Sequence, residues 1–146
     1  MARPYFDTSV LVPAALAQHP HHEPALARLK ELARKKQRGC VSAHGITEFY
    51  SVLTRAPFKP PLHPSEVWRL IEEVILKHLD LVTLTAKESI DVTRGCATAG
   101  WTGGRIHDAM HLRCALKAQC DRIYTFNVKD LRALASPEML SQITAP

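Results

Sequence analysis

The stretch that decides the fold is "RPYFDTSVLV", residues 3–12, in which one acid interrupts an apolar run. Residues 3–6 are typical of a short β-strand, and Asp7 follows that strand directly. Two hydroxyl residues, Thr8 and Ser9, come next. An ionised carboxylate in apolar surroundings is costly unless other groups pair with it. We therefore expect partners for Asp7 elsewhere in the chain.

Similar short β-rich runs recur at residues 39–43, 79–84 and 121–126, each bounded by turn or polar residues. Amphipathic helical periods separate them, in the order β, α, β, α, α, β, α, α, β. The apolar residues that mark these periods are Leu26, Leu29 and Ala33; Ile46, Phe49, Tyr50 and Leu53; Val67, Leu70, Ile71, Val74 and Ile75; and Ile106, Ala109, Met110 and Leu116. Strands separated by helices predict a parallel sheet covered on both faces, which is a three-layer α/β/α domain.

The composition narrows the class of protein. A chain of 146 residues is long enough for one self-sufficient domain, which we expect to span 1–146. No apolar run approaches the ~18 residues of a membrane span, and the start is a poor signal peptide, so we expect a soluble, cytoplasmic protein. The four cysteines form no CxxC pair and are expected to be buried thiols. The net charge of +5 is compatible with a polyanionic partner.

Acids are expected to gather at one edge of this sheet. Ligands of an open parallel sheet bind beyond the carboxyl ends of its strands, where Asp7 lies and where the last run continues into Asn127 and Asp130. Two more acids, Glu48 and Asp108, lie near predicted helix starts. Neighbouring carboxylates would repel by a few kcal/mol per pair at ~4 Å and an effective dielectric of ~20. A divalent cation removes that conflict, and hard oxygen ligands suit Mg²⁺ or Mn²⁺.

The segments that carry these acids resemble the PIN-domain ribonucleases, and most closely the small VapC-type toxins. They are "FDTSVLV", "SAHGITEFYSVL", "GGRIHDAMHLRCAL" and "IYTFNVKDL", beginning at residues 6, 42, 103 and 123. Their order and spacing match over nearly the whole chain. The resemblance implies a sheet of about five parallel strands, a Mg²⁺ or Mn²⁺ site, endoribonuclease activity on RNA, a homodimer, and a type II toxin–antitoxin pair whose antitoxin protein blocks the site.

The resemblance also assigns roles to individual residues. Asp7, Glu48 and Asp108 match the three most regular acids of the family, which hold metal and orient the attacking water. Asp130, rather than the neutral Asn127, is expected to be the fourth acid. Three further polar residues are expected to support the carboxylates or a metal-bound water by hydrogen bonds: Ser9, Thr125 and Asn127. Independently of the resemblance, Arg105 is the expected contact to substrate, because it follows two glycines and precedes Asp108 by three residues.

Each residue also has an ordinary structural interpretation. Asp7 could cap a following helix, and Asp108 could interact with a helix dipole. Glu48 lies nearly opposite the apolar stripe of its helix, so a solvated glutamate fits as well. His107 and His111 are four apart, but the zinc-helix motif lacks its Glu, so we interpret them as packing or RNA-proximal residues.

Two rival functions follow from the same residues. A non-catalytic PIN-like module that binds RNA or a protein is supported by Asn127 standing where an acid is common. A phospho-accepting receiver domain is set aside, because the run at 79–84 offers only threonines at its end. For the homodimer, we expect the stripe from Val67 to Ile75 to form part of the interface or of the core beside it.

Overall fold

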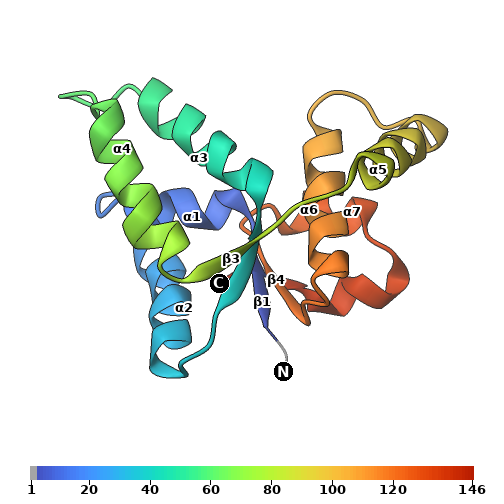
Figure 1. Ribbon diagram of the computed structural model, residues 1–146, viewed down its shortest axis with the longest axis horizontal. Coiled ribbons are helices and arrows are strands. Elements are labelled where there is room, and N and C mark those ends of the chain that lie inside the picture. The colour runs from blue at the N-terminus through green and yellow to red at the C-terminus, as the bar shows by residue number, and fades with distance from the viewer. Residues whose placement is uncertain (1–2) are drawn as a thin grey trace.

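A five-stranded parallel sheet lies at the centre of the computed structural model, which describes residues 3–146 (Figure 1). The strand order across the sheet is β3-β2-β1-β4-β5. The strands are β1 (Pro4–Phe6), β2 (Gly39–Ser42), β3 (Leu79–Val82), β4 (Arg122–Tyr124) and β5 (Ile143–Thr144). β1 is therefore the middle strand, flanked by β2 and β4. The predicted three-layer α/β/α architecture is confirmed.

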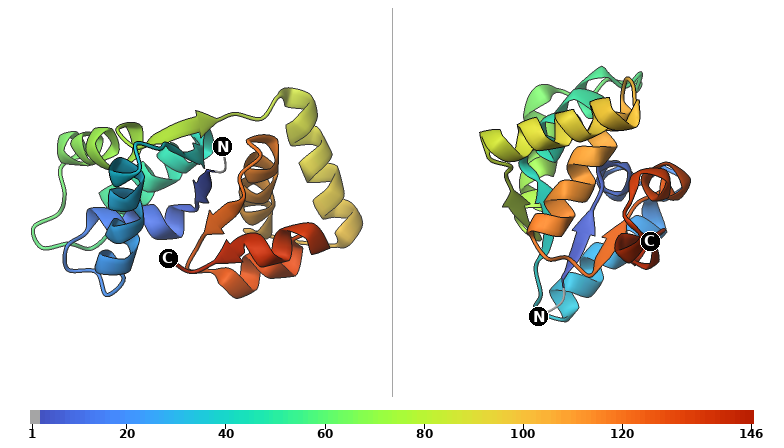
Figure 2. Two further views of the ribbon diagram at one scale, coloured as in Figure 1. Left: turned by 90° about the horizontal axis from the view of Figure 1, so that it is seen from below. Right: turned by 90° about the vertical axis from the view of Figure 1, so that its right-hand side faces the viewer.

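Helices cover both faces of the sheet (Figures 1 and 2). One layer consists of α1 (Thr8–Ala15), α2 (His22–Arg34), α3 (Ala43–Arg55) and α4 (Pro64–Leu70), which continues as the π-helix η1 (Ile71–Leu76). The other consists of α5 (Ala86–Ala99), α6 (Arg105–Lys117), α7 (Val128–Leu134) and the 3₁₀-helix η2 (Pro137–Gln142). Both figures place α5 outermost, beyond α6. No helix within residues 3–146 is long and apolar enough to span a bilayer.

The alternation of side chains along β1 divides the core between the two faces. Phe6 is buried in the cluster under α1–α4, and Tyr5 is buried in the cluster under α6 and α7. The backbone N–H of Asp7 donates to the carbonyl of Tyr124 at 3.0 Å, which extends the pairing of β1 with β4 by one residue. Asp7 is thereby held at the carboxyl end of the middle strand.

Several elements differ from the sequence prediction. Two helices, α1 and α2, connect β1 to β2 where one was expected, because α1 is only eight residues long and contains Pro13, which weakens its helical signal. The last strand, β5, has two residues and was implied only by the family resemblance. A strand this short carries no periodicity and becomes recognisable only through its pairing with β4.

The stripe considered for a dimer interface belongs to the core. Val67, Ile71 and Ile75 are fully or almost fully buried, and Leu70 and Val74 pack against the same cluster. The prediction that the stripe contributes to the core is therefore correct, and little of it is left for a partner. The four cysteines are buried and free, as expected.

Candidate active site

Asp7 is buried, with 4% of its surface exposed, and its charge is met by hydroxyl groups. Its Oδ2 accepts hydrogen bonds from Ser9 Oγ and from Thr125 Oγ1, both at 2.8 Å. Ser9 is two residues away in α1, and Thr125 directly follows β4. The backbone N–H groups of Phe126 and Asn127 in turn donate to these two hydroxyl oxygens. These bonds orient both hydroxyl protons toward Asp7 and compensate its desolvation.

Glu48, on α3, lines the same hollow as Asp7 and is half-buried rather than fully solvated. The imidazole of His111, from α6, lies between the two carboxylates. Its Nε2 is 3.1 Å from Glu48 Oε1 and 3.5 Å from Asp7 Oδ1. His44, one turn before Glu48, lies on the outer side with its Nε2 3.6 Å from the same oxygen.

The opposite nitrogen of His111 is bound as well. Nδ1 lies 2.6 Å from the hydroxyl of Tyr5, and that hydroxyl accepts the backbone N–H of Ser42 at 3.1 Å. Tyr5 and His111 are both buried. The interpretation of His111 as a packing or RNA-proximal residue is therefore incomplete, since it contacts two of the four predicted acids. The sequence signal that could have placed His111 in the site is its position three residues after Asp108, because this spacing puts both side chains on one face of α6.

The pKa values reflect this crowding. Burial raises the pKa of Asp108, and the negative charges of Asp7, Asp130 and Glu48 raise it further, while His111 opposes them. For Glu48, burial works in the same direction, but the hydrogen bond and charge of His111 outweigh it and lower the pKa. Burial disfavours a charged His111, yet the Glu48 contact and the surrounding acids raise its pKa. The charges of the three other predicted acids thus reach Asp108 at the sheet edge.

Three of these acids share an open hollow of about 360 Å³. Its lining includes Asp7, Glu48, Asp108, His111 and Asn127. Asp130 lies in the first turn of α7, where its charge acts on Asp108, but it does not line the hollow. Arg105 is the exposed first residue of α6 and is not part of this lining either.

The donor chemistry of the hollow fits a hard divalent cation. Carboxylate oxygens and the Asn127 amide are the ligand types that Mg²⁺ and Mn²⁺ prefer. A cation would also relieve the repulsion that, after burial, raises the pKa of Asp108. Within residues 3–146, however, no three His, Cys, Asp or Glu side chains are arranged so that they could hold an ion directly. Coordination would therefore need small side-chain rotations or intervening waters, and Mg²⁺ usually retains several waters.

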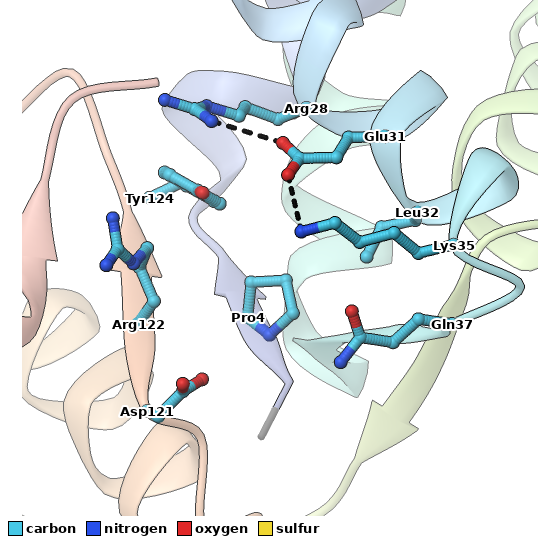
Figure 3. A pocket seen from close by; sticks show the side chains of 9 residues that line it. All are labelled: Pro4, Arg28, Glu31, Leu32, Lys35, Gln37, Asp121, Arg122 and Tyr124. Atoms are coloured by element: carbon cyan, nitrogen blue, oxygen red, sulfur yellow. Dashed lines mark hydrogen bonds and ion pairs between the residues drawn. The ribbon is translucent and has the colours of Figure 1, made fainter. Parts of the chain in front are cut away.

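A larger hollow, of about 510 Å³, lies between α2 and β4 (Figure 3). It reaches the amino ends of the strands at Pro4 and Arg122, away from the acids that follow β1. Glu31 at its wall is paired with both Arg28 and Lys35, at 3.1 and 2.7 Å. Because the Glu31 carboxylate is already bound by two cations, this hollow is a poorer candidate for catalysis than the smaller acidic one.

Residues 3–129 match the family model of the PIN domain. This chain belongs to the PIN-domain family. The family predicted from the four sequence segments is therefore confirmed.

Individual PIN-domain proteins resemble the chain over much or most of its length. Ribonuclease VapC27 of Mycobacterium tuberculosis is 31% identical over 104 residues, which cover 71% of this chain and 70% of that protein. The crystal structure of M. tuberculosis VapC20, described as a sarcin-ricin loop cleaving toxin, superposes with a TM-score of 0.70 at 17% identity, covering 98% of this chain and 99% of the other. VapBC2 of Rickettsia felis, bound to a promoter DNA fragment, gives 0.68 at 16% identity, with 98% of both chains covered. At these identities the two structures support the fold.

Proposed function

We propose that this protein is a Mg²⁺- or Mn²⁺-dependent endoribonuclease and the toxin of a type II toxin–antitoxin pair, acting in the cytoplasm. The observation that carries the proposal is the acidic hollow at the carboxyl end of the middle strand in a PIN domain. The names of the relatives support RNA as the substrate, since one is a ribonuclease and another cleaves an RNA loop. The VapBC2 likeness supports an antitoxin partner.

Asp7, Glu48 and Asp108 would hold the metal, with Asp130 as an outer fourth acid. A divalent cation bound there would supply a water of lowered pKa and would stabilise charge on the scissile phosphate. Ser9 and Thr125 orient the carboxylate of Asp7 through their two hydrogen bonds. The amide of Asn127 can donate to or accept from a water or a phosphate oxygen at the rim.

Arg105 is proposed to contact the RNA backbone. Its position at the start of α6, three residues before Asp108, leaves its guanidinium free to reach a phosphate near the acids. Removing one phosphate contact should raise KM and leave kcat nearly unchanged.

The deciding experiment is a cleavage assay on total RNA that compares the wild type with Asp7→Asn. Cleavage by the wild type in Mn²⁺, its loss in a chelator, and no cleavage by Asp7→Asn are the expected results. The alternative function is a non-catalytic PIN-like module, which Asn127 in place of an acid favours. Such a module would bind RNA or a protein partner but would cleave no RNA, whichever metal ion is added.

We also propose a homodimer, as the family resemblance implies. Sedimentation equilibrium at micromolar concentration should give twice the chain mass of 16.3 kDa. A single species of monomer mass would contradict this part of the proposal.

A further inference from the structure

We propose that His111 is a positioning residue, which is held by Tyr5 and which fixes the carboxylates of Asp7 and Glu48 beside each other. The role rests on the proposed metal-dependent function of this site. It goes beyond that function because it assigns a role to His111 and Tyr5, neither of which offers the carboxylate or amide oxygen that such an ion prefers.

The hydrogen-bond partners of His111 determine which of its ring nitrogens carries the hydrogen. The backbone N–H of Ser42 can only donate, so the Tyr5 hydroxyl accepts that bond at 3.1 Å. Nε2 faces carboxylate oxygens, which only accept hydrogen bonds when they are ionised, so in neutral His111 the ring hydrogen sits on Nε2. Nδ1 is then unprotonated and accepts the proton of the Tyr5 hydroxyl, 2.6 Å away. Protonated His111 carries that hydrogen too, so the hydrogen bond to Glu48 does not depend on the charge of the ring.

The Nε2–H group bridges carboxylates from two different elements. Its distances are 3.1 Å to Glu48 Oε1, from α3, and 3.5 Å to Asp7 Oδ1, at the end of β1. The imidazole side chain is only 3% exposed and packs from α6 against Tyr5 of β1, so it has little freedom to follow a moving partner. It is a fixed hydrogen-bond donor to Glu48 and, when protonated, a fixed positive charge beside Asp7, and these two carboxylates would otherwise repel each other.

Glu48 is the partner that needs this restraint. Its flexible side chain is 28% exposed, and His44 offers a second imidazole on the outer side, 3.6 Å away. Asp7 is already fixed through its other oxygen by Ser9 and Thr125. Loss of His111 should therefore release Glu48 toward His44 and solvent more than it disturbs Asp7. Groups that orient metal ligands in this way typically change metal affinity or activity 10–100-fold when they are removed.

The experiment measures Mn²⁺ binding by calorimetry on four variants. His111→Leu removes the donor and should raise the Kd of Mn²⁺ about 10–100-fold. His111→Gln keeps an N–H that can reach the acids and should recover part of the affinity. Tyr5→Phe leaves the ring but frees its Nδ1, and it should weaken binding less than His111→Leu. Tyr124→Phe removes another tyrosine hydroxyl, outside the hollow, and should bind as the wild type does.

A double-mutant cycle separates positioning from a general loss of structure. If His111 acts through Glu48, His111→Leu should weaken Mn²⁺ binding much less in a Glu48→Gln background than in the wild type. A purely structural role would give the same loss in both backgrounds. Equal Mn²⁺ affinity of folded His111→Leu and wild type would overturn the proposal.

A second readout needs neither metal nor a stable His111 variant. Nitrogen NMR of the metal-free wild type, at a pH where the ring is neutral, should show the hydrogen of His111 on Nε2, and Tyr5→Phe should loosen this preference. A hydrogen on Nδ1 in the wild type would contradict the proposal directly. A wild type that binds Mn²⁺ but cleaves no RNA would count against the proposed function alone, and the Mn²⁺ affinities would still decide the role of His111.

Discussion

Asp108 is the residue on which the crowding of acids acts most directly. Its raised pKa means that the folded protein binds this proton more tightly than the unfolded chain does. Stability is therefore lost as the pH rises from the usual acid range of Asp through the raised pKa. In a chelator, Asp108→Asn should remove this loss, so the variant should unfold at a higher temperature than wild type at pH 7 and at a similar temperature at pH 3.

Thermal unfolding followed by circular dichroism between pH 3 and 8 measures this difference. Asp121→Asn is the control, because Asp121 is an exposed acid just before β4 and lines the larger hollow, not the acidic one. A stability curve of Asp108→Asn that runs parallel to that of the wild type would mean that the repulsion is too weak to matter.

Asp130 and Asn127 compete for the fourth position of the site. Asn127 lines the hollow, whereas Asp130 lies in the first turn of α7 and acts on Asp108 only through its charge. Because an amide cannot offset metal charge, Asp130→Asn should weaken Mn²⁺ binding several-fold, and Asn127→Ala should mainly slow RNA cleavage. Mn²⁺ affinity and cleavage rate are measured under one condition. Wild-type behaviour of Asp130→Asn together with loss of both activities in Asn127→Ala would transfer the role to Asn127.

At the scale of elements, α3 places Glu48 at the acidic hollow because the helix approaches the sheet closely at Gly45. Ser42 caps the helix by accepting the N–H of Gly45 at 2.9 Å. A Cβ at Gly45 would come within 2.8 Å of Val41 Cγ2, and the Val41 side chain is buried and stiff. Gly45→Ala should therefore destabilise the protein by roughly 1–3 kcal/mol, as overpacking does. Because α3 would shift, Mn²⁺ binding should weaken as well.

Gly95 provides the matched control. It lies inside α5, and a Cβ there would meet nothing within 4 Å. Gly95→Ala should stabilise the protein by roughly 0.5–1 kcal/mol, because alanine favours the helix and restricts the unfolded chain. Urea unfolding of both variants checks the pair. Two stabilising substitutions would mean that α3 tolerates the added methyl group and that its approach is not tight.

At the scale of the whole molecule, metal binding at the proposed site should couple to folding, because the proposed ligands come from distant parts of the chain. Asp7, Glu48 and Asp108 meet only in the folded state, so a bound cation stabilises that state alone. Mn²⁺ at 100 times its Kd should add about 2.7 kcal/mol, which raises the melting temperature by roughly 5–10 °C. Asp7→Asn should abolish the shift, and its melting temperature in a chelator should equal or exceed that of the wild type.

Differential scanning calorimetry across millimolar Mn²⁺ measures the shift, and Ca²⁺ at equal concentration shows how much of it depends on the ion. A wild-type melting temperature that stays constant over this range would count against the metal site. A shift of equal size in Asp7→Asn would place the ion elsewhere on the protein.

The sequence by itself determined the alternation of strands and helices and the placing of acids after them. These features are local, because side-chain periodicity and strand ends depend on residues a few positions apart. They were sufficient to predict the layers, the parallel sheet and the family. They were not sufficient for β5, whose two residues are a strand only because β4 lies beside them.

Only the tertiary structure decided which hydrogen bonds join the residues in and around the acidic hollow. The bond between Tyr5 and His111 spans 106 positions and that between Thr125 and Asp7 spans 118, and no local pattern encodes either. The sequence placed Asp7 at a strand end, but its partners became identifiable only when β4, α3 and α6 were brought to the same edge of the sheet. The same step separated Asn127, which lines the hollow, from Asp130, which does not, because side-chain direction at the start of α7 depends on how that helix packs.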